Sequence, residues 1–132
     1  MSKAILQSAK VARPRPGQIM SQGVKVPAGN LVFVSGQVAR NAQAEVVGRG
    51  DIKTQTRQVL ENIRSVLETA GATLDDVVKV TVFVTNMEHF SQIHEVRAEF
   101  FKRDYPASTL VEVKALADRD FLIEIDAIAV TS

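Results

Sequence analysis

The sequence has no cysteine and no tryptophan, and it contains two histidines and one tyrosine in 132 residues. Without cysteine, the chain cannot form disulfides, thiolate metal sites or a cysteine nucleophile, and it suits a reducing cytoplasm. Two histidines cannot supply a zinc site with three histidine ligands, so no metal is predicted. The scarcity of tryptophan and tyrosine leaves few stacking platforms for single strands, and nucleic acid is not an expected partner.

Long apolar runs and nucleotide-binding motifs are also missing. The longest apolar run, residues 121–130, is interrupted by Glu124 and Asp126 and is far shorter than the roughly 20 residues that span a bilayer. Gly48 and Gly50 lack the third glycine of a dinucleotide-binding loop, and no Gly-Lys-Ser/Thr phosphate loop occurs. The sequence therefore predicts a cytoplasmic protein that uses no membrane and no cofactor.

Positive charge is concentrated at the N-terminal end. The net charge is +1, yet residues 1–44 contain six Lys or Arg residues and no acid. We interpret residues 1–16, which include Pro14 and Pro16, as a basic arm. Residues 17–132 are interpreted as one domain, since this length suits a single hydrophobic core. A mitochondrial presequence is the alternative interpretation of the arm, because presequences are also free of acids.

Apolar periodicity predicts elements in the order β-β-α-β-α-β-β. Asp51 is a suitable N-cap for the first helix, and Gly71 is a suitable residue to end it. The first two strands flank Pro27-Ala28-Gly29 and are expected to pair antiparallel. The predicted strands cover residues 18–26, 30–36, 77–85, 109–116 and 121–130, and the predicted helices cover residues 52–70 and 87–103.

Both helices are expected to cover one face of a mixed sheet, because right-handed crossovers place consecutive helices on the same side. In the strand at 77–85, the even-numbered residues from Val78 to Val84 are expected to share a face. Whichever face of the last strand the helices cover, the other face is also apolar, because Leu122, Ile128 and Val130 lie opposite Phe121, Ile123 and Ile125. A chain of this size is not expected to expose such a face, so a partner subunit is predicted.

Glu124 and Asp126 are the most unusual residues of the last strand. They are two positions apart, so both side chains leave the same face among apolar neighbours. A carboxylate there is costly unless it is paired or hydrogen-bonded, and general acid–base catalysis uses carboxylates in such surroundings. The alternative is that both acids reach solvent or pair with a basic neighbour such as Lys114 or Arg97.

Histidine and serine provide weaker signals. His89 and His94 are five residues apart, a spacing that differs from the i,i+4 pair of a helical metal site. His94 alone is either an ordinary polar helix residue or a functional one. Ser108 and Thr109 precede a strand, but no Gly-x-Ser-x-Gly motif surrounds a serine, which disfavours a serine hydrolase.

Four segments resemble the YjgF/Rid family and occur in the family's order. They are LVFVSGQ at 31–37, QTRQVLENI at 55–63, DVVKVTVF at 76–83 and IEIDAIA at 123–129. The similarity runs from about residue 20 to residue 130. The resemblance implies a chorismate-mutase-like α+β fold and a homotrimer that binds a small-molecule ligand in clefts between subunits.

Deaminating members of this family hydrolyse reactive enamines and imines, such as 2-aminoacrylate, to keto acids and ammonia without a metal or cofactor. The resemblance implies that Glu124 orients the attacking water, which is why Glu124 is preferred to Asp126. It also implies that the backbone of Ser35 and Gly36 meets the ligand.

Three ligand contacts differ from the pattern of those members. Ser108 stands where they have a carboxylate-binding arginine, Met20 where they have a cleft tyrosine, and His94 where they have a helix asparagine. With Thr109 and Leu110, these residues complete the predicted binding site.

The favoured hypothesis is a metal-free deaminase or related hydrolase with Glu124 as its catalytic residue. Loss of a bidentate guanidinium at position 108 should weaken binding of a simple 2-imino acid unless His94 or Arg97 compensates. The substrate is therefore expected to be a small enamine or imine whose anionic group is absent or bound differently. The alternatives are a non-catalytic trimer that binds a metabolite and, less favoured, an endoribonuclease.

Overall fold

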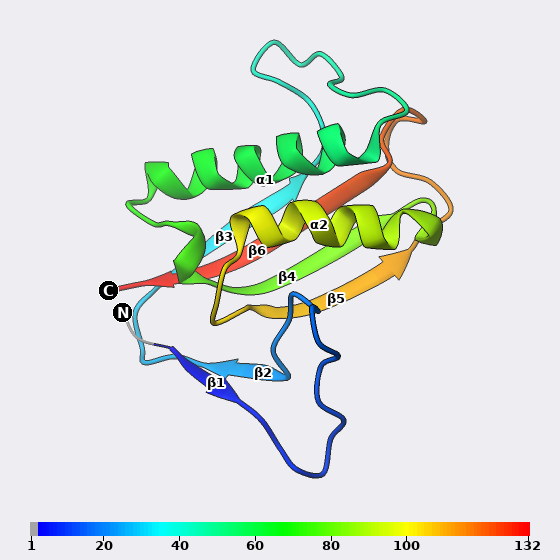
Figure 1. Cartoon of the computed structure of the whole chain (residues 1–132). Helices are drawn as coiled ribbons and strands as arrows, with labels where there is room; N and C mark the ends of the chain where they lie inside the picture. The colour runs from blue at the N-terminus through cyan, green and yellow to red at the C-terminus, as the bar shows by residue number, and fades with distance from the viewer. Residues whose placement is uncertain (1–2) are drawn as a thin grey trace.

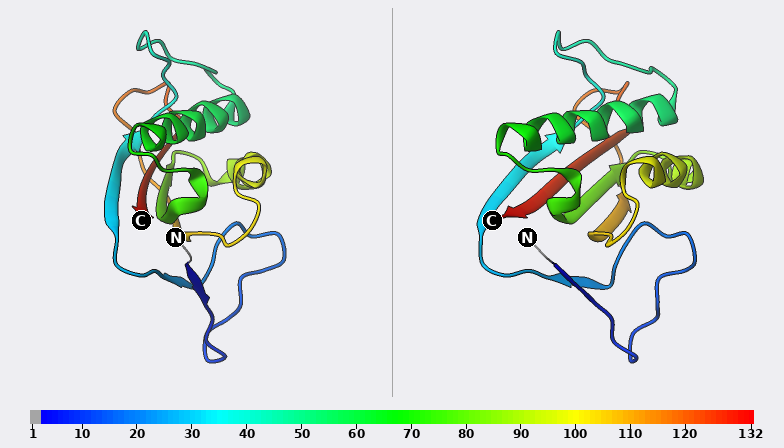
Figure 2. Two further views of the ribbon diagram at one scale, coloured as in Figure 1. Left: turned by 90° about the vertical axis from the view of Figure 1, so that its left-hand side faces the viewer. Right: turned by 60° about the vertical axis from the view of Figure 1, so that its left-hand side comes forward.

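The computed structural model describes residues 3–132 and has two layers, a four-stranded sheet and two helices packed against it (Figure 1). Figure 2 shows both helices on the same side of the sheet. The predicted α+β architecture is confirmed. In chain order the elements are β1 (Ala4–Leu6), β2 (Gly23–Lys25), β3 (Asn30–Gln37), α1 (Ile52–Thr69), η1 (Leu74–Asp76), β4 (Val77–Val84), η2 (Met87–His89), α2 (Phe90–Phe100), β5 (Ala107–Glu112) and β6 (Ile123–Thr131).

Helix α1 forms because its apolar residues recur at helical spacing and both of its ends are capped. The Asp51 carboxylate accepts a hydrogen bond from Thr54 N at 3.2 Å, which satisfies a free donor of the first turn. Gly71 follows the last turn with a φ of +70°, a conformation that glycine adopts without strain. The helix packs on β3 and β6. Its buried apolar stripe consists of Ile52, Val59, Leu60, Ile63 and Leu67.

Strand β6 lies in the middle of the sheet although it is the last strand in chain order. The strands are arranged β3-β6-β4-β5, with β6 antiparallel to both neighbours and β4 parallel to β5. The predicted pairing of residues 18–26 with residues 30–36 is wrong, because β2 pairs with β1 in a separate two-stranded sheet. β6 offers β3 a partner of nine residues, whereas β2 has three.

The two faces of the main sheet are covered differently. The odd-numbered residues of β6 from Ile123 to Ala129 are buried in the core shared with the helices. Glu124 and Asp126 alternate with them and therefore lie on the open face. On the neighbouring strand of this face, Leu31 and Phe33 are 61% and 69% exposed. The face that the helices leave open is thus apolar at one end and acidic further along β6.

A bulge changes the predicted faces of β4. The pairing with β6 shifts between Val77 and Lys79, so Val77 joins Val80 in the core and Val78 is only partly buried. The even-numbered pattern expected from Val78 onward therefore holds only from Val80.

Helix α2 is shorter than predicted. The Asn86 side chain accepts a hydrogen bond from Glu88 N at 3.0 Å and begins a 3-10 turn, so the α-helix starts at Phe90. It ends at Phe100 rather than at residue 103. Within residues 3–132, no helix has the length and apolar character needed to cross a bilayer.

Candidate functional site

Glu124 lies against a bulge in the neighbouring strand β3. The pairing of β3 with β6 shifts between Val34 and Gln37, so Ser35 and Gly36 carry the extra residue. A Cβ added to Gly36 would stand 2.8 Å from Glu124 Cδ, so the carboxylate occupies the space that a side chain would fill. Bulges are common beside functional sites because they redirect side chains. We call Glu124, Ser35 and Gly36 the bulge site.

The chain that follows the bulge is held by Asn62 of α1. Asn62 Nδ2 donates to Val38 O at 3.1 Å and to Arg40 O at 2.9 Å, and Oδ1 accepts from Gln58 Nε2 at 2.8 Å. A hollow of about 430 Å³ lies between this segment and α1, and Gly36 forms part of its wall. A small molecule in the hollow can therefore reach the glycine that Glu124 contacts.

Asp126, the second acid on the open face, has a structural role. Its Oδ1 accepts a hydrogen bond from Thr81 N at 3.2 Å, across the β6–β4 pair. The ion pairs found in residues 3–132 include neither Glu124 nor Asp126. Within the described chain, neither Lys114 nor Arg97 therefore forms the ion pair with these acids that the alternative interpretation predicts.

A second cavity, of about 260 Å³, lies between α2 and β5. Ser108 and Leu110 line it from β5, His94 and Arg97 from α2, and Met20 from the segment before β2. Four of these five are binding residues predicted from the sequence, and Arg97 is the addition. We call this pocket the α2–β5 cavity.

Arg97 is the buried cation of the α2–β5 cavity. It is 2% exposed, and its Nη2 donates to Ile19 O at 3.0 Å and to Ser108 Oγ at 3.1 Å. Burial lowers the pKa of Arg97 to about 10, so the guanidinium is charged at neutral pH. The cavity therefore contains a positive charge.

His94 is neutral under the same conditions. Burial, and then the nearby charge of Arg97, lower the pKa of His94 below its usual value. Its ring lies 4.2 Å from that of Phe90, and its Nδ1 is buried without a hydrogen-bond partner within residues 3–132.

Thr109 belongs to neither group. It is exposed on the open face, where its Oγ1 accepts a hydrogen bond from Lys79 Nζ at 2.9 Å. The structure thus brings the predicted residues together in two places, with the bulge site on the open face and the α2–β5 cavity on the helix side. One chain alone does not bring Glu124 to the cavity.

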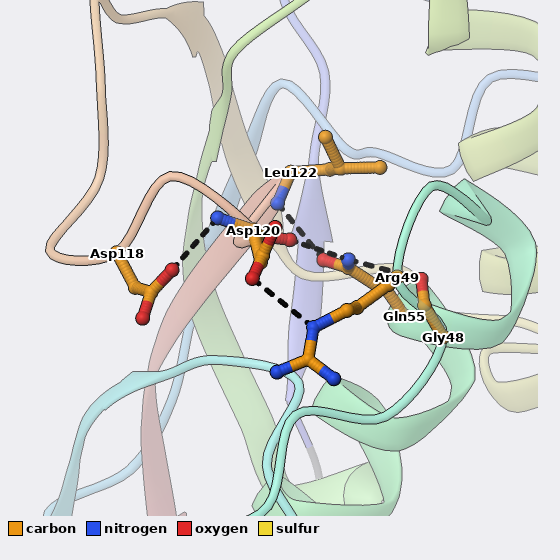
Figure 3. A network of polar contacts seen from close by, with 6 residues as sticks. All are labelled: Gly48, Arg49, Gln55, Asp118, Asp120 and Leu122. Atoms are coloured by element: carbon orange, nitrogen blue, oxygen red, sulfur yellow. Dashed lines mark hydrogen bonds and ion pairs between the residues drawn. The ribbon is translucent and has the colours of Figure 1, made fainter.

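Gln55 of α1 connects the two loops beside the start of β6 (Figure 3). Its Nε2 donates to Gly48 O at 3.1 Å and to Asp120 O at 2.8 Å, and its Oε1 accepts from Leu122 N at 2.8 Å. The side chain is fully buried, so water does not compete for these bonds. Because Leu122 is two residues before Glu124, this network fixes the start of the strand that carries the acid.

Comparison with known proteins identifies the family. The family model described as Endoribonuclease L-PSP matches residues 11–131. A crystal structure of a Rid-family protein of unknown function from Yersinia pestis has a TM-score of 0.90 and 34% identity, covering 99% of this chain and 100% of that one. The chain belongs to the YjgF/Rid family. The predicted resemblance is therefore confirmed.

Curated relatives of this Rid-family chain differ in how they are named. A RutC family protein of Pyrococcus horikoshii is 48% identical over 116 residues, which is 88% of this chain and 90% of the relative. A 2-iminobutanoate/2-iminopropanoate deaminase of Dermatophagoides farinae is 37% identical over 117 residues, or 89% of each chain.

Gln55 is not among the residues predicted from the sequence of this Rid-family chain, and Arg97 is predicted only as a partner of the two acids or as a compensating cation. The sequence does contain a feature that distinguishes these two residues: each is a polar residue at a helical position where the spacing calls for an apolar one. Gln55 stands three residues after Ile52 on the buried stripe of α1, and Arg97 stands beside Ile93 and Val96 on that of α2. A polar residue at such a position must find buried partners.

Proposed function

We propose that this Rid-family chain is a deaminase of small enamines and imines with Glu124 as its catalytic residue. The observation that carries the proposal is the Glu124 carboxylate held against Gly36 at the bulge site. Because glycine has no side chain, the carboxylate can lie directly against the β3 backbone at Gly36, which also forms part of the wall of the hollow of about 430 Å³. Similarity to a named 2-imino acid deaminase supports the reaction class.

The proposed chemistry needs one group that accepts and returns a proton. Water attacks the carbon of the protonated imine while Glu124 takes a proton from the water, and a carbinolamine forms. Glu124 then gives this proton to the amine nitrogen. The C–N bond breaks as the hydroxyl proton passes to the departing nitrogen. One iminium ion and one water thus give one carbonyl compound and one ammonium ion.

We further propose that the working site is a cleft between subunits of a homotrimer. The bulge site and the α2–β5 cavity lie on different sides of the sheet within one chain, so a neighbouring subunit is needed to bring them together. The exposed Leu31 and Phe33 on the open face support this assembly, because apolar side chains of this size are usually covered by a partner.

Phe33→Asp is expected to dissociate the trimer, because it places a charge in the apolar part of the open face. Native mass spectrometry should show three times the 14.4 kDa subunit mass for the wild type and a lower mass for the variant. Val11→Asp is the matched control, since Val11 is 55% exposed outside the sheet. A trimer that survives Phe33→Asp would contradict the proposed interface.

Keto-acid release from freshly generated 2-aminoacrylate tests the proposed activity. The purified protein is expected to release pyruvate and ammonium faster than buffer or heat-denatured protein does. Saturable ligand binding with release no faster than in buffer would replace the deaminase by a non-catalytic binding protein. RNA cleavage without keto-acid release would favour the endoribonuclease alternative.

A further inference from the structure

Strand pairing holds the bulge of β3 more firmly on its N-terminal side than on its C-terminal side. From Asn30 to Val34, every residue of β3 is paired with β6. After the bulge, the described sheet has one further pair, Gln37 opposite Ile125, and β3 ends there. The position of Gly36 therefore also depends on what holds the chain beyond Gln37.

Asn62 of α1 holds this part of the chain with both hydrogens of its side-chain amide. Its Nδ2 donates to Val38 O at 3.1 Å and to Arg40 O at 2.9 Å. An amide nitrogen has two hydrogens to donate, so this capacity is filled. The carbonyls belong to the first and third residues after β3, on either side of Ala39. Asn62 thus joins the chain on both sides of Ala39 to the helix.

The orientation of the Asn62 amide is fixed by a neighbour on the same helix. Gln58, four residues earlier on α1, donates from Nε2 to Asn62 Oδ1 at 2.8 Å. Residues four apart on a helix lie beside each other, so this contact needs no distortion of α1. Because the oxygen is engaged by Gln58, the nitrogen faces the chain that follows β3. The donors of Asn62 are therefore held in place by a rigid element.

Other contacts hold the middle of the same segment. Ala39 is fully buried in the core, and its carbonyl accepts a hydrogen bond from Val47 N at 2.8 Å. Between the segment and α1, however, lies the hollow of about 430 Å³, so packing against the helix is incomplete. Within residues 3–132, the side-chain hydrogen bonds that connect α1 to residues 38–47 are those of Asn62. Their loss should let the segment move toward the hollow while the core stays folded.

A movement of this segment reaches Glu124 through Gly36. Gly36 is two residues before Val38, and a Cβ added to it would stand 2.8 Å from Glu124 Cδ. The carboxylate and the β3 backbone are therefore in direct contact, and a shift of the backbone must move the carboxylate or open a gap beside it. Catalysis is sensitive to such changes, because a misplacement of about 1 Å can cost roughly 100-fold in rate.

We propose that Asn62 is a positioning residue for Glu124 and that it acts through the bulge at Gly36. This role rests on the proposed function, since the position of the carboxylate affects turnover only if Glu124 is catalytic. Asn62 itself contacts neither the substrate nor the reacting atoms. It keeps the β3 backbone in the place that the carboxylate needs. A residue of α1, on the helix side of the sheet, thereby controls a group on the open face.

Asn62→Ala is expected to lower kcat for keto-acid release from 2-aminoacrylate by roughly 5- to 50-fold, with a smaller change in KM, because the proton acceptor is displaced. Asn30→Ala is the matched control. Asn30 Nδ2 also donates to a backbone carbonyl, Ser132 O at 3.3 Å, but at the other end of β3, so kcat should not change. Circular dichroism and native mass establish that both variants are folded and assembled. A wild-type kcat in Asn62→Ala, or an equal loss in Asn30→Ala, would overturn the proposal.

The Glu124→Gln background distinguishes positioning from a general structural role. If Asn62 acts through the carboxylate, Asn62→Ala should cause little further loss of activity once that carboxylate is an amide. A substitution that only weakens the fold would lower the remaining activity by the same factor in both backgrounds. An equal factor in the two backgrounds would therefore contradict a positioning role.

The ¹³C NMR signal of the Glu124 carboxyl carbon tests the positioning without any turnover. In protein labelled at the glutamate carboxyl carbons, it is the signal that is missing from Glu124→Gln. Asn62→Ala is expected to shift it, and Asn30→Ala is not. If Asn62→Ala does not fold, Asn62→Asp replaces it, because aspartate has nearly the same shape, still accepts from Gln58 and lacks both donors. An unmoved Glu124 signal in the folded variant would overturn the proposal.

The two measurements separate this proposal from the proposed function. A shifted Glu124 signal in Asn62→Ala, with no keto-acid release by the wild type, would remove the deaminase and leave Asn62 as the residue that positions the carboxylate. Keto-acid release by the wild type, with an unchanged kcat and an unmoved Glu124 signal in Asn62→Ala, would remove the positioning role and leave the deaminase.

Discussion

Glu124→Gln is expected to lower the rate of keto-acid release from 2-aminoacrylate by roughly two to four orders of magnitude, because an amide cannot accept the proton of the attacking water. The amide has nearly the shape of the carboxylate, so the fold and the trimer mass should not change. The kcat and KM values of the variant provide the measurement. A fall in kcat with little change in KM is expected for a group that acts in the transition state.

Asp126→Asn is the matched control for this substitution. Asp126 lies on the same face two residues away, and its Asn replacement keeps an oxygen that can accept from Thr81 N. Its effect on kcat is therefore expected to be small. An equal loss of activity in Asp126→Asn and Glu124→Gln would contradict the catalytic assignment of Glu124.

Gly36→Ala tests the geometry of the same carboxylate by a different route. The added methyl group would meet Glu124 and displace its flexible side chain, so activity should fall while the trimer stays folded. The double variant Gly36→Ala/Glu124→Gln should lose little more activity than Glu124→Gln alone, because both substitutions act on the same carboxylate. Gly23→Ala, whose Cβ would make an ordinary 3.5 Å contact with Leu6, is the control.

Gln55→Leu is expected to lower the free energy of unfolding by about 3 to 5 kcal/mol, a large part of the stability of a small protein. Leucine fills a similar volume but leaves Gly48 O, Asp120 O and Leu122 N without their buried partner. Urea unfolding at one fixed protein concentration is the measurement, because the stability of an oligomer such as the proposed trimer depends on concentration.

Gln58→Leu is the control for Gln55→Leu on the same helix. Gln58 is partly buried and makes a single hydrogen bond to Asn62, so its replacement should cost much less. Equal destabilisation by both substitutions would mean that the Gln55 network adds little beyond ordinary helix packing.

Periodicity predicted the elements whose signals are local. The buried stripe of α1 between Asp51 and Gly71 is an example, because capping and spacing depend on nearby residues. Pairing partners were harder to predict. Residues 18–26 were assigned to the strand nearest in sequence, but the main sheet is built from long-range pairs in which β3 joins β6. The length and apolar character of distant strands decide such pairings.

The candidate site was predicted in part for a similar reason. Family resemblance gave Glu124 and Gly36, and the bulge that brings them into contact depends on the register of two strands about 90 residues apart. The contact between Arg97 and Ser108 depends on how α2 packs over β5. Neither position follows from spacing along the chain.

The central place of β6 also affects how the protein is made. β3 and β4 are joined only through β6, so the sheet stays divided until residues 123–131 have left the ribosome. Until then, β3 lacks its partner and the apolar stripes of both helices lack a finished surface to cover, a state in which nascent chains aggregate easily. The strand that carries Glu124 therefore completes the core, and a nascent chain places this carboxylate against Gly36 only when the sheet is complete.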